Sequence, residues 1–180
     1  MAYTTINKSS DHFDTRTYSA SGAGSVSDVA FQPDFLWFKN RTGVGDHGLM
    51  DAIRGVNKIL HSNDAVTERT SGASNDFTAF TSNGFTYGAS SQLDTSTGTP
   101  CTWLWKANGS GSANTVGSIN STVSVNATSG FSIVSWQGTD ANASVGHGLS
   151  KAPTMVFYKT RGLGESWVVY NKQIGAGYKL

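Results

Sequence analysis

A short apolar run that occurs twice is the feature that most constrains how this chain can fold. Residues 31–41 read FQPDFLWFKNR and residues 149–161 read LSKAPTMVFYKTR, and a turn containing glycine follows each of them. Each has a proline, then four apolar residues in succession, then a Lys-x-Arg pattern. Such a run is too brief for an ordinary helix, so it predicts a buried β-strand. Its repetition indicates two related modules in tandem.

The matching positions keep a constant separation along the chain. Phe13 and Tyr18 match Phe131 and Trp136, which lie 118 positions later. From Pro33 onward the separation is 120, and it pairs Lys39 with Lys159, Arg41 with Arg161, His47 with Trp167, Asp51 with Asn171, and Gly55 with Gly175. Leu180 matches Leu60, about halfway through the first module's pattern. Because the period is the size of a domain, we expect one module and an incomplete second copy, not a solenoid.

The remaining segments predict short strands separated by turns, and none has the sustained 3.6-residue period of a helix. We expect an all-β fold: a β-sandwich module of jelly-roll or lectin-like type, followed by the partial copy. Residues 76–80 and 84–88 predict a hairpin, because Asn83-Gly84 suits a tight turn. Residues 144–148 are expected to form a strand, and residues 19–25 a flexible loop. The predicted organisation is an N-terminal arm (1–12), a first module (13–107), a Gly/Ser/Asn linker (108–117) and a partial second module (118–180).

Composition excludes several classes of function. Charged residues make up 14% of the 180 residues and the net charge is +1, which gives no electrostatic basis for binding nucleic acid or an anionic membrane. No apolar run approaches the roughly 20 residues that cross a bilayer. Residues 1–8 lack the apolar core of a signal peptide. The single cysteine, Cys101, allows no internal disulfide and is consistent with synthesis in a reducing cytoplasm.

Candidate catalytic and ligand-binding groups are few. Asp11 with Asp14, or Asp46 with Asp51, would be the carboxylate pairs for glycoside hydrolysis. The second copy, however, has Ser166 in place of Asp46 and Asn171 in place of Asp51. The four histidines (His12, His47, His61 and His147) have no metal-binding spacing. We therefore predict no catalytic residue, no metal site and no cofactor.

The aromatic residues are the better candidates for function. Aromatic side chains dominate both protein cores and interfaces, so we expect packing or interface roles. The alternative is a platform of tryptophans that stacks on sugars. The candidate residues are Phe35, Trp37, Phe38, Trp103, Trp105, Trp136, Phe157 and Trp167, and we expect Trp37 and Trp103 to be mostly buried.

Several of these motifs together resemble a family of marine bacteriophage structural proteins. They are MAYTTINKSSDHF at the start, FQPDFLWFK at 31–39, GFT at 84–86, WLWKA at 103–107, GFSIV at 130–134 and VGHGL at 145–149. The resemblance covers nearly the whole chain. It implies repeated modules of lectin-like β-sandwich character, encoded in genes for tail fibres or other virion appendages.

On this resemblance we expect a non-enzymatic structural component of a bacteriophage particle, most readily a tail fibre or appendage or its virion-anchoring N-terminal part. The expected partners are further copies of the chain, in a trimer if it is a fibre, and other virion proteins. The expected location is the virion, after synthesis in the host cytoplasm. The alternatives are a capsid decoration (cement or head-fibre) protein, a carbohydrate-binding module for host surface glycans, and a glycan-degrading enzyme.

Overall fold

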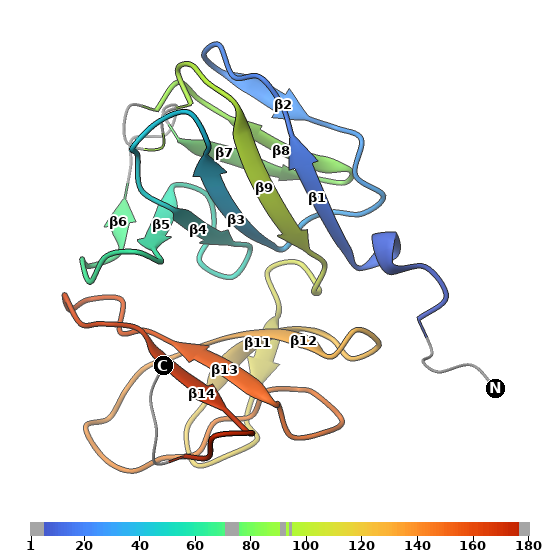
Figure 1. Ribbon diagram of the computed structural model, residues 1–180. Helices are drawn as coiled ribbons and strands as arrows, with labels where there is room; N and C mark the ends of the chain where they lie inside the picture. Colours follow the sequence, from blue (N-terminus) through green and yellow to red (C-terminus); the bar gives the residue numbers. More distant parts are fainter. Residues whose placement is uncertain (1–5, 71–75, 91–92, 94, 177–180) are drawn as a thin grey trace.

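The computed structural model describes residues 6–176 apart from 71–75, 91–92 and 94. It consists of strands and loops, and a single 3-10 turn, η1 (Ser9–Asp11), is the only helical segment of the described chain. The strands form two units, one above the other in Figure 1. Strands β1 to β9 make up the first unit and strands β10 to β14 the second. Within the described ranges, no helix is long and apolar enough to cross a membrane.

The larger sheet of the first unit has six antiparallel strands. Their order is β1 (Phe13–Thr17), β9 (Pro100–Trp105), β3 (Phe35–Asn40), β4 (Gly48–Asp51), β5 (Lys58–His61) and β6 (Arg69–Thr70). The repeated apolar run therefore forms β3, near the centre of the sheet. The late strand β9 lies between β1 and β3, so the sheet joins residues far apart in the sequence (Figure 1).

A smaller sheet covers one face of the larger one. Its order is β2 (Gly24–Val26), β8 (Gly84–Tyr87) and β7 (Phe77–Thr81). Side chains alternate along a strand, so Leu36, Phe38 and Leu104 point to the covered face and are almost completely buried. They share one core with Phe77 and Phe85 of the smaller sheet. The prediction of an all-β, sandwich-type fold is confirmed, and so is the predicted hairpin, as β7 and β8.

Three local predictions are wrong in whole or in part. The expected flexible loop at 19–25 runs into β2, and the expected linker at 108–117 contains β10 (Ser112–Asn114). In the 108–117 segment, small residues allow close contact with the backbone of β11 (Ser121–Asn126). A Cβ atom on Gly111 would lie 2.6 Å from the Val123 carbonyl oxygen. Conversely, the expected strand at 144–148 is reduced to one bridge between Gly117 and Val145, because its Gly148 adopts a left-handed φ of 71°.

The expected N-terminal arm is partly integrated into the fold. The Lys106 N–H donates to the carbonyl of His12 at 2.9 Å. The His12 ring nitrogen Nδ1 lies 2.9 Å from the side-chain amide of Asn126 in the second unit. Residues 1–5 of this arm lie outside the described residues. The arm residues nearest β1 therefore contact both units.

The second unit has two small sheets. One contains β10, β11 (Ser121–Asn126) and β12 (Phe131–Trp136), and the other contains β13 (Met155–Tyr158) and β14 (Val168–Asn171). The β13–β14 pair repeats the register of β3–β4 at a separation of 120: Met155 faces Asn171 as Phe35 faces Asp51. The turns repeat as well, with φ of 85° at Gly55 and 82° at Gly175.

The retained lysines perform the same task in both units. The Lys39 ammonium donates to the Gly45 carbonyl at 2.8 Å, and the Lys159 ammonium donates to the carbonyl of Glu165, which is 120 positions beyond Gly45. Each lysine thus fixes the loop that follows its strand. Over the β3–β4 segment and its loop, the repeat is therefore structural, down to individual hydrogen bonds.

Asp34 holds the chain segment that follows β9, and a substitution can test this role. Its buried carboxylate accepts hydrogen bonds from the Gln32 side chain (2.9 Å) and the Ala107 N–H (2.7 Å). Asp34→Ala would leave the buried Ala107 N–H unpaired, and we expect a loss of about 1–3 kcal/mol of unfolding free energy. Thr154→Ala, at the matching exposed position of the second unit, should change it by less than about 0.5 kcal/mol. Urea unfolding of both variants measures the difference, and equal losses would contradict this role of Asp34.

An aromatic seam joins the two units. The Phe131 ring of β12 stacks on Trp105 of β9 with centroids 6.0 Å apart and planes at 21°. It also lies 5.9 Å from the Phe35 ring. Phe13, which matches Phe131 in the repeat, packs edge-on against the same Trp105 at 4.9 Å. The uncovered face of the first unit's larger sheet is therefore partly covered by the second unit.

Candidate assembly surface

Matching positions in the two units differ sharply in exposure. Leu36 is 0% exposed and its counterpart Val156 is 39% exposed. Phe38 is 2% exposed and its counterpart Tyr158 is 41% exposed. The smaller sheet covers Leu36 and Phe38, whereas the described part of the second unit contains no such layer over Val156 and Tyr158. Side chains of core character therefore lie at the surface of the second unit.

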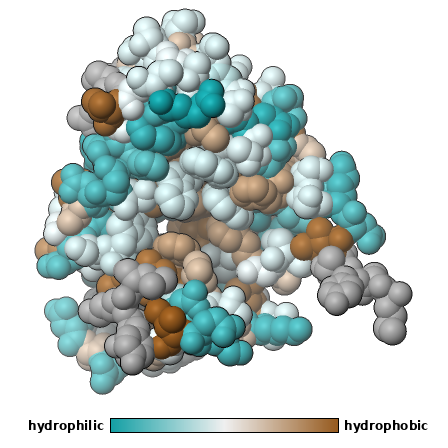
Figure 2. All heavy atoms as spheres, in the orientation of Figure 1, coloured by the Kyte–Doolittle hydropathy of each residue, from teal (hydrophilic) through white to brown (hydrophobic). Residues whose placement is uncertain are grey.

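These side chains form a continuous group, which we call the apolar edge. It consists of Trp136 at the end of β12 and all four residues of β13: Met155, Val156, Phe157 and Tyr158. Phe157 is the most exposed of them, at 59%. The rings of Trp136 and Tyr158 stack with centroids 5.7 Å apart and planes at 18°. In Figure 2, brown hydrophobic atoms lie at the junction of the units and on the lower unit, while pale and teal atoms cover most of the upper unit.

Each strand of the apolar edge also has one backbone edge that no described strand pairs with. In the first unit β9 pairs with both β1 and β3. Their counterparts β12 and β13 each end a separate sheet, and no described strand pairs with them on these edges. Unpaired strand edges readily pair with other chains. The second unit therefore combines open hydrogen-bonding edges with exposed apolar side chains.

The candidate aromatic residues of the first unit divide between its two faces. Phe38 lies in the core, and Phe35 and Trp105 belong to the aromatic seam. Trp37 and Trp103 lie opposite each other on the outer face, partly buried, with ring centroids 6.0 Å apart. The fully buried positions are the alternate residues, so the tryptophans line the sheet from outside.

The candidates of the second unit have different surroundings. Trp136 and Phe157 belong to the apolar edge. Trp167 is partly buried, and its indole N–H donates to the carbonyl of His61 in the first unit at 2.7 Å. Trp167 thus helps to dock the two units on each other.

His47, which matches Trp167, also has a packing role. The Trp37 indole N–H donates to its Nδ1 atom at 3.0 Å. Burial, together with the nearby charge of Lys39, lowers the pKa of the His47 imidazole. The ring is therefore neutral at neutral pH, as an acceptor at Nδ1 requires. The aromatic environment is shared by both modules, although the residue type differs.

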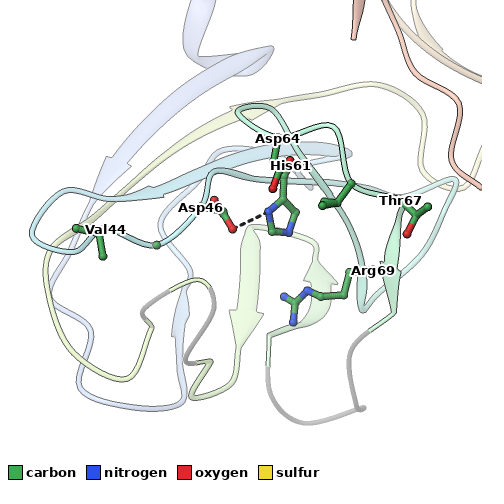
Figure 3. A pocket seen from close by; sticks show the side chains of 8 residues that line it. Val44, Asp46, His61, Asp64, Thr67 and Arg69 are labelled. Carbon is green, nitrogen blue, oxygen red and sulfur yellow. Dashed lines mark ion pairs between the residues drawn. The ribbon is translucent and has the colours of Figure 1, made fainter. Parts of the chain in front are cut away.

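A cavity of about 470 Å³ lies beside β5 and β6 (Figure 3). His61 points toward Asp46 there, with 3.0 Å between Nδ1 and the carboxylate, and the His61 side chain is 6% exposed. Hydrogen bonding from Asn63 lowers the pKa of the Asp46 carboxyl, with burial opposing and His61 adding to the effect. No described side chain forms a hydrogen bond with the other ring nitrogen of His61, so the pair has no attached nucleophile.

The carboxylates suggested by the sequence do not converge on one site. Asp51 is held by Arg54, while Asp46 faces His61. Asp14 is paired with Arg16, and Asp11 with Lys8. Each carboxylate therefore has a local structural partner. Among the described residues, no three metal-ligating side chains gather into a potential metal site.

Glu68 carries a further polar contact between the units, which was not predicted from the sequence. Its side chain is 9% exposed. Arg161 of the second unit donates to it through Nε (2.8 Å) and Nη2 (2.7 Å), and Arg54 donates from the first unit at 3.2 Å. The Glu68 N–H also donates to the Arg161 carbonyl at 2.8 Å. The retained Arg161 is thus a docking residue.

The Glu68 contact predicts that the docking of the units depends on pH. Burial alone would raise the pKa of the Glu68 carboxyl, but hydrogen bonds and charge from Arg161 and Arg54 outweigh burial and lower it. A lowered pKa means that the stabilisation is complete above the usual glutamate pKa of about 4.3 and is lost as the pH falls through the lower folded value. We expect Glu68→Gln to cost about 1–3 kcal/mol of unfolding free energy at neutral pH and to remove this acid-dependent part.

Urea unfolding of the wild-type chain and the Glu68→Gln variant, from about pH 7 to about pH 3, measures this contribution. Glu165→Gln is the matched control, because Glu165 is exposed and close to Arg161 in sequence. The two stability curves of wild type and Glu68→Gln should converge in acid. Parallel curves would show that the Glu68 charge does not support the docking.

The fold and the surface define an all-β protein of two units that share one repeated strand pair, and among the described strands the second unit has an open, apolar sheet edge. The chain belongs to the family described as Domain of unknown function (DUF7483), whose model matches residues 8–180. No curated protein and no solved structure matches the chain.

Proposed function

We propose that this chain is a non-enzymatic structural component of a bacteriophage particle, of the tail-fibre or appendage type. In this proposal the chain contacts neighbouring proteins of the particle through the apolar edge of its second unit. The observation that carries the proposal is the exposure of Val156 and Tyr158, whose counterparts in the first unit are core residues. The assignment to a virion rests on the resemblance of the sequence motifs to phage structural proteins.

Exposure of this kind supports an assembly role. Large exposed apolar patches on proteins typically mark interaction sites. Four consecutive apolar residues of β13 expose side chains on both faces of the strand, next to an unpaired backbone edge. A partner strand that covered the edge would bury the apolar side chains and would pair the backbone groups that now face water.

The remaining candidate sites support enzymatic or sugar-binding functions less well. The Asp46–His61 pair has no attached nucleophile among the described residues. The Trp37 and Trp103 rings meet at 64°, so the two do not form one flat surface on which a sugar ring could stack. A capsid decoration protein would use the same apolar edge on a different part of the particle.

The proposal is tested by locating the chain in purified particles. A phage that encodes the chain with a short affinity tag would be purified on a density gradient, and its proteins identified by mass spectrometry. We expect the chain in the particle fraction at a fixed ratio to the capsid protein, and the tag on an appendage in electron micrographs. A tag on the capsid surface would favour a decoration protein, and a chain confined to the unassembled lysate would contradict the proposal. A glycan array with the purified chain tests the sugar-binding alternative.

A further inference from the structure

In the first unit, β9 fills the position between β1 and β3 with an antiparallel ladder on each side. Trp103 faces Thr15 on one side and Trp37 on the other. Leu104 faces Asp14 and Leu36 in the same way and is 0% exposed. A single strand thus satisfies two edges and completes the core.

The second unit repeats both edges that receive β9. β12 corresponds to β1 at a separation of 118, and β13 corresponds to β3 at a separation of 120. A strand in the position of β9 would therefore face Ile133 and Phe157 where β9 has Trp103. At the position of Leu104 it would face Ser132 and Val156.

We infer that β12 and β13 form an acceptor for one antiparallel β-strand with the side-chain pattern of β9, supplied by a polypeptide segment other than the described residues. This inference rests on the proposed function and specifies the chemistry of the partner. Strand addition of this kind takes its affinity from main-chain hydrogen bonds and its specificity from alternate side chains.

The edges define what the partner strand must carry. The side chains that would flank its centre are uncharged: Ser132, Ile133, Val134, Val156 and Phe157. A charged residue at the position of Leu104 would be desolvated there without a counter-ion, which is costly. The acceptor therefore selects an extended segment with apolar or aromatic residues on both faces, as in the Thr-Trp-Leu-Trp sequence of β9.

A geometric argument and an existing interface favour an inserted strand over contact with the sheet edge of a second copy. An edge of a second copy would pair with either β12 or β13 and would leave the other unpaired, whereas one inserted strand pairs with both. The acceptor also continues an existing interface, because Phe131 of β12 already stacks on Trp105 of β9. The Trp136–Tyr158 stack joins the two strands at the other end of β12, so an incoming strand would meet this ring pair.

A peptide taken from the chain itself is the probe. A fluorescein-labelled peptide of residues 99–107, with Cys101→Ser to prevent oxidation, would be titrated with the full 180-residue chain and followed by anisotropy. We expect saturable binding, weakened at least about tenfold by Leu104→Asp in the peptide. Tyr158→Asp in the chain should weaken binding at least about tenfold, whereas Leu163→Asp, at an exposed turn position of the same unit, should leave it unchanged.

Hydrogen exchange of the peptide complex then locates the bound strand. Protection of both β12 and β13 amides supports the acceptor. Absence of binding, equal binding of the Leu104→Asp peptide, or protection of only one of the two strands overturns it. Self-association of the chain that excess peptide does not reverse would mean that copies cover each other's edges, which also overturns it. If Tyr158→Asp fails to fold, the peptide series decides alone. Any of these failures would leave the test of particle location unaffected.

Discussion

Phe38→Ala is expected to lower the free energy of unfolding by about 3–5 kcal/mol, the usual cost of truncating a buried phenylalanine. Phe38 is 2% exposed and packs in the core between the two sheets of the first unit. The Tyr158→Ala variant is the matched control, because Tyr158 occupies the same place in the β13–β14 register but is 41% exposed. Its truncation removes a side chain that is only partly buried, against the Trp136 ring, so we expect a loss below about 1 kcal/mol.

Urea denaturation of both variants, with the slope of the transition as a check on two-state behaviour, measures the contrast. Similar large losses would mean that the Tyr158 ring is buried in the isolated chain, and the apolar edge would then not be open. Similar small losses would contradict the position of Phe38 in the core.

Arg54→Ile is expected to cost about 3–5 kcal/mol, because it removes one member of a buried charge network. Side chains of Arg54, Asp51 and Glu68 are 6%, 7% and 9% exposed, and the guanidinium contacts both carboxylates. It also donates to the Leu49 carbonyl at 2.9 Å. Without Arg54, two carboxylates would be buried with less compensating charge, which is the costly case for an ion pair.

The second unit supplies the control for this prediction. At the matching positions it has Asn171 and Ile174, which carry no charge. The Asp51→Asn, Arg54→Ile double variant therefore gives the first unit the uncharged residues that the second unit has at these positions. We expect it to lose less stability than the sum of the two single variants, by about 0.5–3 kcal/mol, because the residues share one network. Additive losses would show that Arg54 acts independently of Asp51.

The repeat made the β3–β4 and β13–β14 pairs predictable, because a proline followed by an apolar run marks a strand start in both copies. The small strands β2 and β10 could not be predicted in the same way. They are rich in glycine, serine and asparagine, and backbone hydrogen bonds to neighbouring strands hold them in place. The strand predicted at residues 144–148 is not formed, because Gly148 adopts a left-handed conformation that interrupts the extended backbone.

The exposure of the apolar edge could not be predicted from the residues of β12 and β13 alone. Val156 and Tyr158 look like core residues, and their counterparts Leu36 and Phe38 are core residues. What distinguishes the two sets is the presence of β9 and of the β2–β8–β7 layer, which come from distant parts of the chain. Likewise, the Glu68–Arg161 contact joins residues 93 positions apart in the sequence.

The central claim is that the apolar edge is an assembly surface, and sedimentation velocity of the isolated 180-residue chain tests it most directly. The account predicts association that increases over micromolar concentrations, is reversed by an excess of the 99–107 peptide, and is lost in a Phe157→Ser, Tyr158→Ser double variant that keeps the wild-type melting profile. A chain that remains a well-folded monomer across this range, with residues 118–176 resistant to protease, would contradict the claim.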